Sequence, residues 1–354
     1  MNNTWQNLDL DEKMAALQTV ARKRGIDERA VEKDWWVTVV LNALYSTQVA
    51  PHLNFKGGTS LSKGYSLIHR FSEDIDLSIS RKFFLDVLGK SFAKAENNTQ
   101  LKNLRKTSRD FIHEVLSEEL KRHLEDMGVK GFKIRNHTYI ETEKGLSPIS
   151  HDSDPTVIFV DYESIFPSYD GDIQPRVKIE ISCLSMDEPF EINEINTMLN
   201  EHSKEDSKFP QIDEELTVST RTVTPSRTFL EKIFLLSEEF QKDNPRFRRM
   251  SRHLYDIEKI MDTNYGIEAL ANSDLYKKII AHREKYYHLG YVDYTKDYPD
   301  KIDFVPSGEN LINYKKDYEE NMVDGYIYND ALAFEEIIKR LTALQNRIRQ
   351  LHLN

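Results

Sequence analysis

The strict alternation of polar and apolar residues in two short segments constrains the fold most. Residues 74–80 have the sequence DIDLSIS, and residues 176–183 have the sequence RVKIEISC. A period of two places like side chains on one face of a strand, so both segments are predicted to be strands with one face packed on a core. Further strands are predicted at 52–56, 131–140, 156–162 and 216–220.

Apolar residues spaced as on one face of a helix occur before and between these strands, and they dominate the last third of the chain. Before the boundary near residue 222, helices are predicted over 8–24, 27–45 and 98–127, and the polar stretch 200–211 is predicted to be a loop. After Pro225, the predicted helices cover 228–240, 249–261, 266–287 and 331–351. This order predicts an α+β chain with one mixed domain over 1–222, on which the helices within 1–50 pack, and a helical domain over 223–354.

Composition excludes several classes of protein. The 48 Lys and Arg residues against 59 Asp and Glu residues give a net charge of −11, so a global positive field for nucleic acid is absent and a polyanionic substrate needs a local basic patch or metal ions. The single cysteine, Cys183, excludes an internal disulfide and a multi-cysteine zinc site. The longest nearly apolar stretch, 35–45, is shorter than the about 20 residues that a bilayer requires, and the polar and acidic opening residues lead us to expect no leader. We therefore expect a cytoplasmic protein without a membrane partner.

A glycine turn precedes the first alternating strand. Residues 57–60 have the sequence GGTS and are predicted to open a helix that carries Leu61, Tyr65 and Ile68 on one face. Glycines allow backbone N–H groups to approach a phosphate closely, and a helix N-terminus favours an anion there. The Ser60 hydroxyl is predicted to contact the same oxygens, whereas Lys63 could pair with a phosphate or reach solvent.

Asp74 and Asp76 are predicted to point to the same face of their strand, with Cα atoms roughly 6.5–7 Å apart. Two like charges on one face are unfavourable unless a cation neutralises them. Mg²⁺ prefers carboxylates together with phosphate oxygens, and two such ions about 3.5–4 Å apart could span the pair. The alternative is the polar face of a hairpin edge in water. The position directly after a glycine turn favours a metal site.

Glu180 is the candidate for a third carboxylate, because it lies on the polar face of its strand. It could hold a second metal ion or accept the proton of an incoming hydroxyl. Lys178 lies on the same face and could equally neutralise Glu180 in an ordinary ion pair. The alternation leaves both interpretations open.

The helical half contains fewer chemically distinctive residues. Lys232 lies on an otherwise apolar helix, where a lysine often reaches the surface. Asp256 shares a helix face with His253, although a surface pair between Arg252 and Asp256 would explain it as well. The densest basic cluster is a possible contact for an RNA backbone, or it solvates a helix end; it consists of Arg246, Arg248, Arg249 and Arg252.

Several of these segments together resemble the AbiEii/AbiGii family of nucleotidyltransferase toxins, which includes the MenT-like toxins. The resemblance is sharpest in FKGGTSLSK at 55–63 and RFSEDIDL at 70–77. It extends to EKDWWV at 32–37, VKIEI at 177–181, PSRTFLEK at 225–232 and RHLYD at 252–256.

The resemblance implies a polymerase-β-like nucleotidyltransferase domain joined to a helical domain, with the active site between them. Such an enzyme transfers a nucleotide from a nucleoside triphosphate (NTP) to a hydroxyl group with Mg²⁺, or Mn²⁺ as the alternative ion, and releases pyrophosphate. The expected biological role is that of a toxin in a toxin–antitoxin or phage-defence system. The expected acceptor is RNA, with the tRNA 3′ end preferred, so that translation is blocked, and an antitoxin encoded by a neighbouring gene is the expected protein partner.

The resemblance also assigns roles to single residues. The triphosphate is expected at the glycine turn and the lysine after it, that is, at Gly57, Gly58, Thr59, Ser60 and Lys63. Asp74, Asp76 and Glu180 would bind metal, Lys232 would contact phosphates and offset charge as pyrophosphate leaves, and Asp256 would complete the polar rim. One departure is Thr59, where the family often has Ser directly after the glycines; the hydroxyl is retained.

Two other functions fit the same residues. The acceptor could be a protein side chain or a small molecule, which the net negative charge favours slightly. Alternatively, the chain could be a catalytically silent nucleotide-binding module, although retention of both Asp74 and Asp76 together with Lys232 and Asp256 argues against it.

Overall fold

The computed structural model describes residues 5–142, 145–167, 173–214, 216–328 and 331–353. The chain forms two compact units, of which the first comprises Met1–Gly64 and Glu73–Thr222 and the second comprises Tyr65–Ser72 and Val223–Asn354. Our predicted boundary followed residue 222, and the structure assigns residues 65–72 to the second unit as well. This short segment contacts residues that are remote in the sequence, so no local pattern revealed its place.

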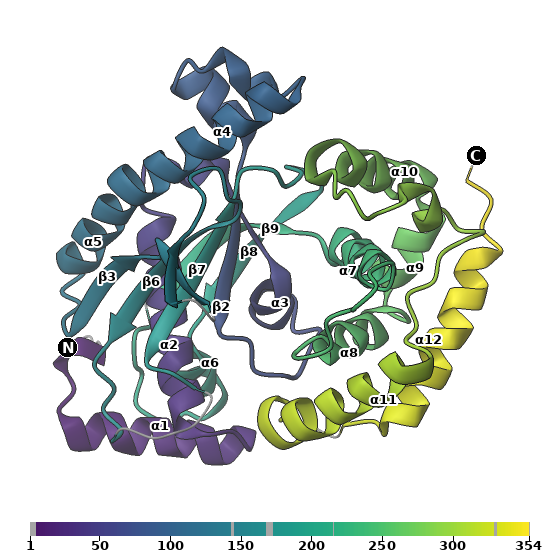
Figure 1. Ribbon diagram of the computed structural model, residues 1–354. Coiled ribbons are helices and arrows are strands. Elements are labelled where there is room, and N and C mark those ends of the chain that lie inside the picture. The colour runs from purple at the N-terminus through teal and green to yellow at the C-terminus, as the bar shows by residue number, and fades with distance from the viewer. Residues whose placement is uncertain (1–4, 143–144, 168–172, 215, 329–330, 354) are drawn as a thin grey trace. The chain divides into compact units, whose positions relative to one another are not determined.

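The first unit is built on a mixed sheet. Among the described residues, seven strands pair in the order β3-β6-β7-β2-β1-β9-β8 (Figure 1). Their bounds are β1 Leu53–Lys56, β2 Asp74–Ile79, β3 Phe132–Asn136, β6 Thr156–Tyr162, β7 Arg176–Ser182, β8 Phe190–Asn196 and β9 Thr217–Val223. The pairs β2–β7 and β1–β9 are parallel, whereas β1–β2, β3–β6 and β6–β7 are antiparallel. The α+β fold class is therefore confirmed.

Helix bounds in the first unit follow the capping signals of the sequence. The helices are α1 Leu10–Arg24, α2 Glu28–Leu44, α3 Gly57–Thr59, α4 Asn98–Asp110, α5 Ser117–Asp126 and α6 Met198–Glu205. Gly25 ends α1 in the left-handed conformation at φ 68°, and the Asp27 side chain accepts from the backbone N–H of Arg29 at the start of α2. Helix α2 is buried along nearly its whole length, and it packs against both β2 and β7. Of the two N-terminal helices, α2 lies on the sheet, and α1 packs against α2 and α6.

Three details of the first unit differ from the prediction. Residues 198–205 form α6 where a loop was predicted, because Met198 and Leu199 are buried against neighbouring helices in spite of the polar composition. Helix α3 continues as a π-helical turn over Ser60–Gly64 and ends there, so Tyr65 and Ile68 do not extend it. The predicted strand at 131–140 is divided, since β4 (Tyr139–Thr142) pairs with β5 (Gly145–Pro148) in a separate hairpin.

The second unit is helical, as the sequence predicted. Its helices are α7 Pro225–Glu239, α8 Ser251–Ile260, α9 Asn264–Ala271, α10 Ser273–His282, α11 Gly308–Asp317 and α12 Phe334–Arg349. Helix α11 was not predicted, and the predicted helix over 266–287 is interrupted at Asn272. Residues 65–72 join this unit through a hydrogen bond from the Phe71 N–H to the Tyr326 carbonyl oxygen (2.7 Å). Among the described residues, no helix has both the length and the apolar character that a bilayer span requires.

A buried carboxyl group makes the stability of the second unit depend on pH. Asp297 is fully buried, accepts a hydrogen bond from Ser237 Oγ (2.8 Å), and lies near the carboxylate of Glu238. Burial, followed by repulsion from Glu238, raises the pKa of Asp297 to about 7. Since the folded protein holds this proton more tightly than the unfolded chain, stability is lost as pH rises from about 4 to about 7.

We therefore expect Asp297→Asn to be more stable than the natural protein at pH 8, by about 1–4 kcal/mol, and nearly equal to it at pH 4. The measurement is urea unfolding of both proteins across this pH range. Asp300→Asn, which removes an exposed carboxylate on the same segment, is the matched control. If the free energy of unfolding changed with pH in the same way in Asp297→Asn and in the natural protein, the raised pKa of Asp297 would be contradicted.

Candidate active site

Three carboxylates share one face of the sheet in the first unit. In the parallel pair β2–β7, Asp74 is opposite Lys178 and Asp76 is opposite Glu180. On the other side of β2, Asp76 is opposite Lys56 of β1. Residues opposite each other in register project to the same face, so all five side chains lie on what we call the carboxylate face.

The strand that carries the aspartates is internal, because β2 lies between β7 and β1. The alternative of an exposed hairpin edge is therefore wrong. Ile75 and Leu77 are fully buried on the opposite face, and on that same face Trp36 of α2 stacks on Tyr162 with ring centroids 4.7 Å apart. The hydrophobic contact with α2 fixes the strand and thereby directs the aspartates to the carboxylate face.

The glycine turn contacts the second aspartate directly. Gly57 has φ +80°, and a Cβ atom at this position would lie 2.1 Å from Asp76 Oδ2. The Thr59 hydroxyl donates to the carbonyl oxygen of Asp74 (2.5 Å), and the Ser60 hydroxyl donates to the carbonyl oxygen of Gly57 (2.9 Å). Both hydroxyl residues are fully buried. In this structure the Thr59 hydroxyl holds the turn against β2, and the Ser60 hydroxyl closes the turn on itself. Contact of either hydroxyl with a triphosphate, like that of Gly58, stays a prediction.

Lys63 has a partner that the sequence did not indicate. Its ammonium group forms a buried ion pair with Asp34 of α2, and the second oxygen of Asp34 accepts from the Met198 N–H (2.7 Å). Neither of the predicted environments, phosphate or solvent, is the one observed. A contact between Lys63 and a phosphate stays a prediction that requires this ion pair to open.

The neighbouring charged residues of α2 also hold loops of the first unit. Lys33 forms a buried ion pair with Glu73 (2.6 Å), the residue directly before Asp74. Glu32 accepts from Ser164 Oγ (2.6 Å) and from the backbone N–H of the next residue. Buried charges persist only when they are paired in this way. The charged residues of α2 therefore fix the start of β2 and the helix after the glycine turn.

Lys178 and Glu180 form an ion pair on the carboxylate face. Burial by itself lowers the pKa of Lys178, but the carboxylates of Glu180, Asp74 and Asp76 outweigh burial and raise it. Burial by itself raises the pKa of Glu180, but the attraction of Lys178, followed by that of Lys56, outweighs burial and lowers it. Both groups are therefore charged at neutral pH, and the ion-pair interpretation of Glu180 is realised in this structure.

The donor set on the carboxylate face suits a metal ion that also binds substrate. Within the part of the chain that the structure describes, no group of three or more His, Cys, Asp or Glu side chains is arranged to hold a metal ion. Mg²⁺ is usually bound through one or two carboxylates, with phosphate oxygens and water completing six ligands. Asp74 and Asp76 provide such a pair beside the predicted triphosphate site.

A buried charge cluster lies in the second unit. Asp256 accepts two hydrogen bonds from the guanidinium group of Arg70, from Nε and Nη2, at 2.7 Å each. Its Oδ2 atom also pairs with Lys232 Nζ (2.9 Å), which lies 3.4 Å from His253 Nδ1. We call Arg70, Asp256 and Lys232 the Arg–Asp–Lys cluster. It shows that Lys232 is buried instead of reaching the surface, and that a surface pair between Arg252 and Asp256 is wrong.

The cluster brings two cationic side chains to one carboxylate; burial lowers the pKa of Lys232, and the attraction of Asp256 opposes that shift. Burial by itself raises the pKa of Asp256, but Arg70 and Lys232 hold that pKa far below its usual range. Burial, followed by repulsion from Lys232, lowers the pKa of His253 well below its usual value, so His253 is neutral at neutral pH. Two buried cations therefore share one buried carboxylate, an arrangement that favours a nearby anion.

The arginine cluster predicted for RNA contact lies before and at the start of α8. Arg246, Arg248 and Arg249 are exposed, and Arg252 is half-buried. Arg246 donates to both carboxylate oxygens of Glu239, and this contact, together with Lys242, outweighs burial and lowers the pKa of Glu239 to about 2. At least one of the four arginines therefore has a structural partner, and RNA contact by the cluster stays a prediction.

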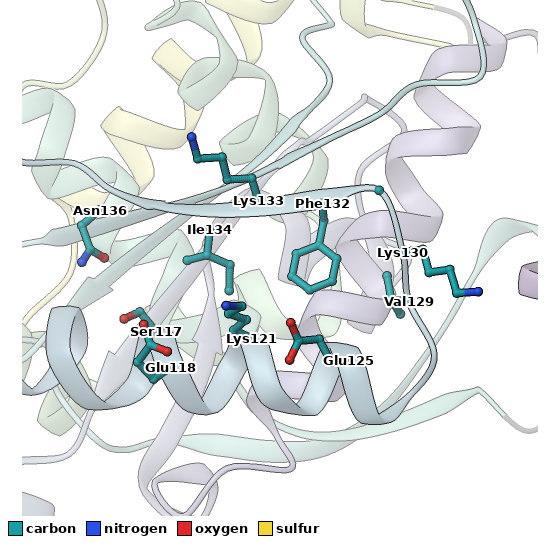
Figure 2. A pocket seen from close by; sticks show the side chains of 11 residues that line it. Ser117, Glu118, Lys121, Glu125, Val129, Lys130, Phe132, Lys133, Ile134 and Asn136 are labelled. Carbon is teal, nitrogen blue, oxygen red and sulfur yellow. The ribbon is translucent and has the colours of Figure 1, made fainter.

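A cavity of about 620 Å³ lies in the first unit between α5 and β3. In Figure 2, the side chains of Phe132 and Ile134 point from β3 toward α5, whereas Lys133 points away. Lysines and glutamates line the cavity, among them Lys121 and Glu125. Because β6 and β7 separate β3 from β2, this cavity is not part of the carboxylate face.

A comparison with protein families gives a match over most of the chain. The family model described as nucleotidyl transferase AbiEii toxin of a type IV toxin–antitoxin system matches residues 39–340. The chain belongs to the AbiEii nucleotidyltransferase toxin family. It is therefore a nucleotidyltransferase toxin of a type IV toxin–antitoxin system, which implies an antitoxin partner.

A solved structure with a similar description also matches this AbiEii-family chain. It is MenT4, a nucleotidyltransferase toxin from Mycobacterium tuberculosis, with 16% sequence identity and a TM-score of 0.47 over 95% of this chain and 90% of that chain. No curated protein matches the sequence.

Several residues of the AbiEii-family site environment were missed or only partly recognised from sequence. Arg70 was quoted within a motif but given no role, and its partner Asp256 is 186 positions away. The buried partners of α2, such as Lys33 with Glu73, were missed as well. A run of three consecutive charges beside two tryptophans on a helix, at 32–36, is the one signal that could have indicated buried ion pairs.

Gly57→Ala is expected to lower nucleotidyl transfer by about 10- to 100-fold, because the new methyl group would displace the carboxylate of Asp76. The positive φ adds a cost of about 1 kcal/mol for any L side chain. Steady-state assays and urea unfolding would measure the two effects. Gly89→Ala is the matched control, because Gly89 also has a positive φ (+64°) but a methyl group added there would have no neighbouring atom within 4 Å. Equal activity of the two variants would contradict the predicted contact.

Proposed function

We propose that this toxin transfers a nucleotide from an NTP to the 3′ hydroxyl of tRNA in a reaction that requires Mg²⁺, and that translation is thereby blocked. The observation that carries the proposal is the arrangement around β2. Asp74 and Asp76 lie on one face of this strand, opposite Lys178 and Glu180 of β7, and Gly57 approaches Asp76 so closely that a Cβ atom there would clash with its carboxylate. This combination suits a metal–triphosphate complex better than a structural role.

The proposed roles in the first unit follow from these contacts. Asp74 and Asp76 would hold Mg²⁺, which supplies charge neutralisation at the triphosphate when it is bound. The backbone N–H groups of Gly57 and Gly58 would bind phosphate oxygens at the start of the helix. Glu180 would act on the metal or on the acceptor proton only after its ion pair with Lys178 loosens. No covalent nucleophile is required, since positioning and electrostatic stabilisation account for most of the catalysis of phosphoryl transfer.

The proposed role of the second unit is to supply positive charge to the substrate. The Arg–Asp–Lys cluster brings two cationic side chains to one carboxylate in a buried setting, where electrostatic interactions are stronger than in water. Lys232 is the member expected to contact phosphates and to stabilise departing pyrophosphate. Asp256 would keep Lys232 oriented, because it accepts from both Lys232 and Arg70.

RNA is the proposed acceptor, and the exposed arginines before α8 are the proposed contacts. Arg246, Arg248 and Arg249 offer positive charge on the surface of an otherwise acidic protein. Family members have an antitoxin partner, and we propose that this chain has one encoded by a neighbouring gene.

Labelled transfer tests the proposal directly. The purified protein is incubated with each of the four α-labelled NTPs, bulk tRNA and Mg²⁺, and the products are separated on a denaturing gel. We expect label on tRNA with at least one NTP, complete loss of labelling in EDTA, and recovery on addition of excess Mg²⁺ or Mn²⁺. Periodate-oxidised tRNA, which lacks the 3′ hydroxyl, is the matched acceptor control and is expected to remain unlabelled.

Each other outcome contradicts a defined part of the proposal. Label on a protein or a small molecule, identified by mass spectrometry, would replace tRNA as the acceptor. Labelling that persists in EDTA would exclude the metal requirement. Nucleotide binding without turnover in either metal ion would indicate a silent binding module.

A further inference from the structure

Lys178 lies on the carboxylate face, where its positive charge helps to neutralise Asp74, Asp76 and Glu180. It is opposite Asp74 in the register of β2 and β7, and adjacent strands are about 4.8 Å apart. Its ammonium group pairs with Glu180, which in turn is opposite Asp76. One lysine is thus paired with Glu180 and interacts electrostatically with Asp74 and Asp76 as well. Lys56, on the neighbouring strand β1, donates to Ser185 Oγ (3.0 Å).

An ammonium group and a metal ion compete for the same carboxylate oxygens. The ion pair with Lys178 occupies an oxygen of Glu180 and places a positive charge opposite Asp74 in the strand register, where it interacts electrostatically with both Asp74 and Asp76. A divalent ion that approaches the two aspartates is repelled by this charge, and the repulsion is strong because the group is about two-thirds buried. An NTP brings several negative charges, which offset this repulsion and attract the divalent ion to the two aspartates.

We propose that Lys178 serves as a built-in cation that neutralises Glu180, limits the carboxylate face to one divalent ion, and makes tight binding of that ion depend on NTP. The inference rests on the proposed function, since it concerns the metal ion that Asp74 and Asp76 are proposed to hold. Lys178 is a positioning residue in this scheme, because it acts through Glu180 and the local charge. Glu180 is then paired with Lys178 in the nucleotide-free protein, and it is available to the metal or the acceptor proton only once that ion pair loosens.

Metal binding without nucleotide tests the inference. Mn²⁺ is titrated into the nucleotide-free protein, and free Mn²⁺ is followed by electron paramagnetic resonance. We expect Lys178→Met to bind Mn²⁺ at least ten-fold more tightly than the natural protein, and to bind more than one ion. Lys178→Arg, which keeps the positive charge, is expected to bind Mn²⁺ as weakly as the natural protein does.

A matched control removes a different cation from the same strand face. Arg176 is two residues before Lys178 on β7 and pairs with Asp161 (3.3 Å), away from the aspartates. Arg176→Met is expected to leave Mn²⁺ binding unchanged. The tighter binding in Lys178→Met is expected to disappear when Asp76→Asn is added, which would locate the bound ion.

Equal or weaker Mn²⁺ binding by Lys178→Met would overturn the inference and leave the proposed function intact. A gain of the same size in Arg176→Met would also overturn it, because the effect would then be one of overall charge. Failure of the natural protein to bind Mn²⁺ even with a non-hydrolysable NTP analogue would instead contradict the proposed function. The two proposals can therefore fail separately.

Discussion

Replacing Asp76 with asparagine is expected to reduce nucleotidyl transfer by at least about 1000-fold while the fold is retained. The substitution keeps the size of a side chain that lies against Gly57, but it removes the negative charge that a metal ion requires. Loss of one group that stabilises transition-state charge costs about 100- to 1000-fold in other enzymes, and loss of a metal ligand adds to this. The measurement is the rate of transfer at saturating NTP, together with unfolding to verify stability.

Asp161→Asn is the matched control for this prediction. Asp161 lies on β6 on the same face of the sheet, where it pairs with Arg135 (3.0 Å) and Arg176 (3.3 Å). Its loss is expected to change transfer by less than about three-fold, since surface ion pairs contribute little. If Asp76→Asn retained the activity of Asp161→Asn, the carboxylate face would not be the active site.

Replacing Asp256 with asparagine is expected to lower the free energy of unfolding by about 3–5 kcal/mol. The substitution leaves Arg70 and Lys232 buried without their shared counter-charge, and removal of one partner from a buried ion pair typically has this cost. Transfer activity is expected to fall as well, because Lys232 loses the group that orients it. Urea unfolding measures the first effect, and transfer assays at low temperature measure the second.

Asp262→Asn provides the matched control on a nearby segment. The Asp262 side chain is 57% exposed and pairs with Arg340 (2.6 Å), so its loss is expected to cost less than about 1 kcal/mol. Adding Lys232→Met to Asp256→Asn removes one of the two uncompensated cations and is expected to recover part of the lost stability. A cost of less than about 1 kcal/mol for Asp256→Asn would show that the buried charges are not energetically coupled.

The features predicted correctly from sequence are those that neighbouring residues decide. The strands at 74–79 and 176–182 follow from a period of two, which reflects the geometry of a single strand. The end of α1 at Gly25 and the start of α2 after Asp27 follow from capping by the residues themselves. Family membership followed from motifs that are continuous in the sequence.

The features that were missed depend on partners far away in the sequence. The polar segment 198–205 is helical because Met198 and Leu199 find apolar neighbours, which its composition does not reveal. The helix at the glycine turn ends at Gly64 because the chain passes there into the second unit. Lys63 was predicted to face phosphate or solvent, but Asp34 on α2 neutralises it in the interior.

The sequence by itself determined which side chains share a strand face, where the glycine turn lies, and which family the chain resembles. Only the tertiary structure decided that Glu180 is opposite Asp76, that Lys178 lies among the three acids, and that Asp256 joins Arg70 to Lys232. The physical reason is that strand register and buried ion pairs are selected by the total free energy of packing. Local periodicity reports only the geometry of one element at a time.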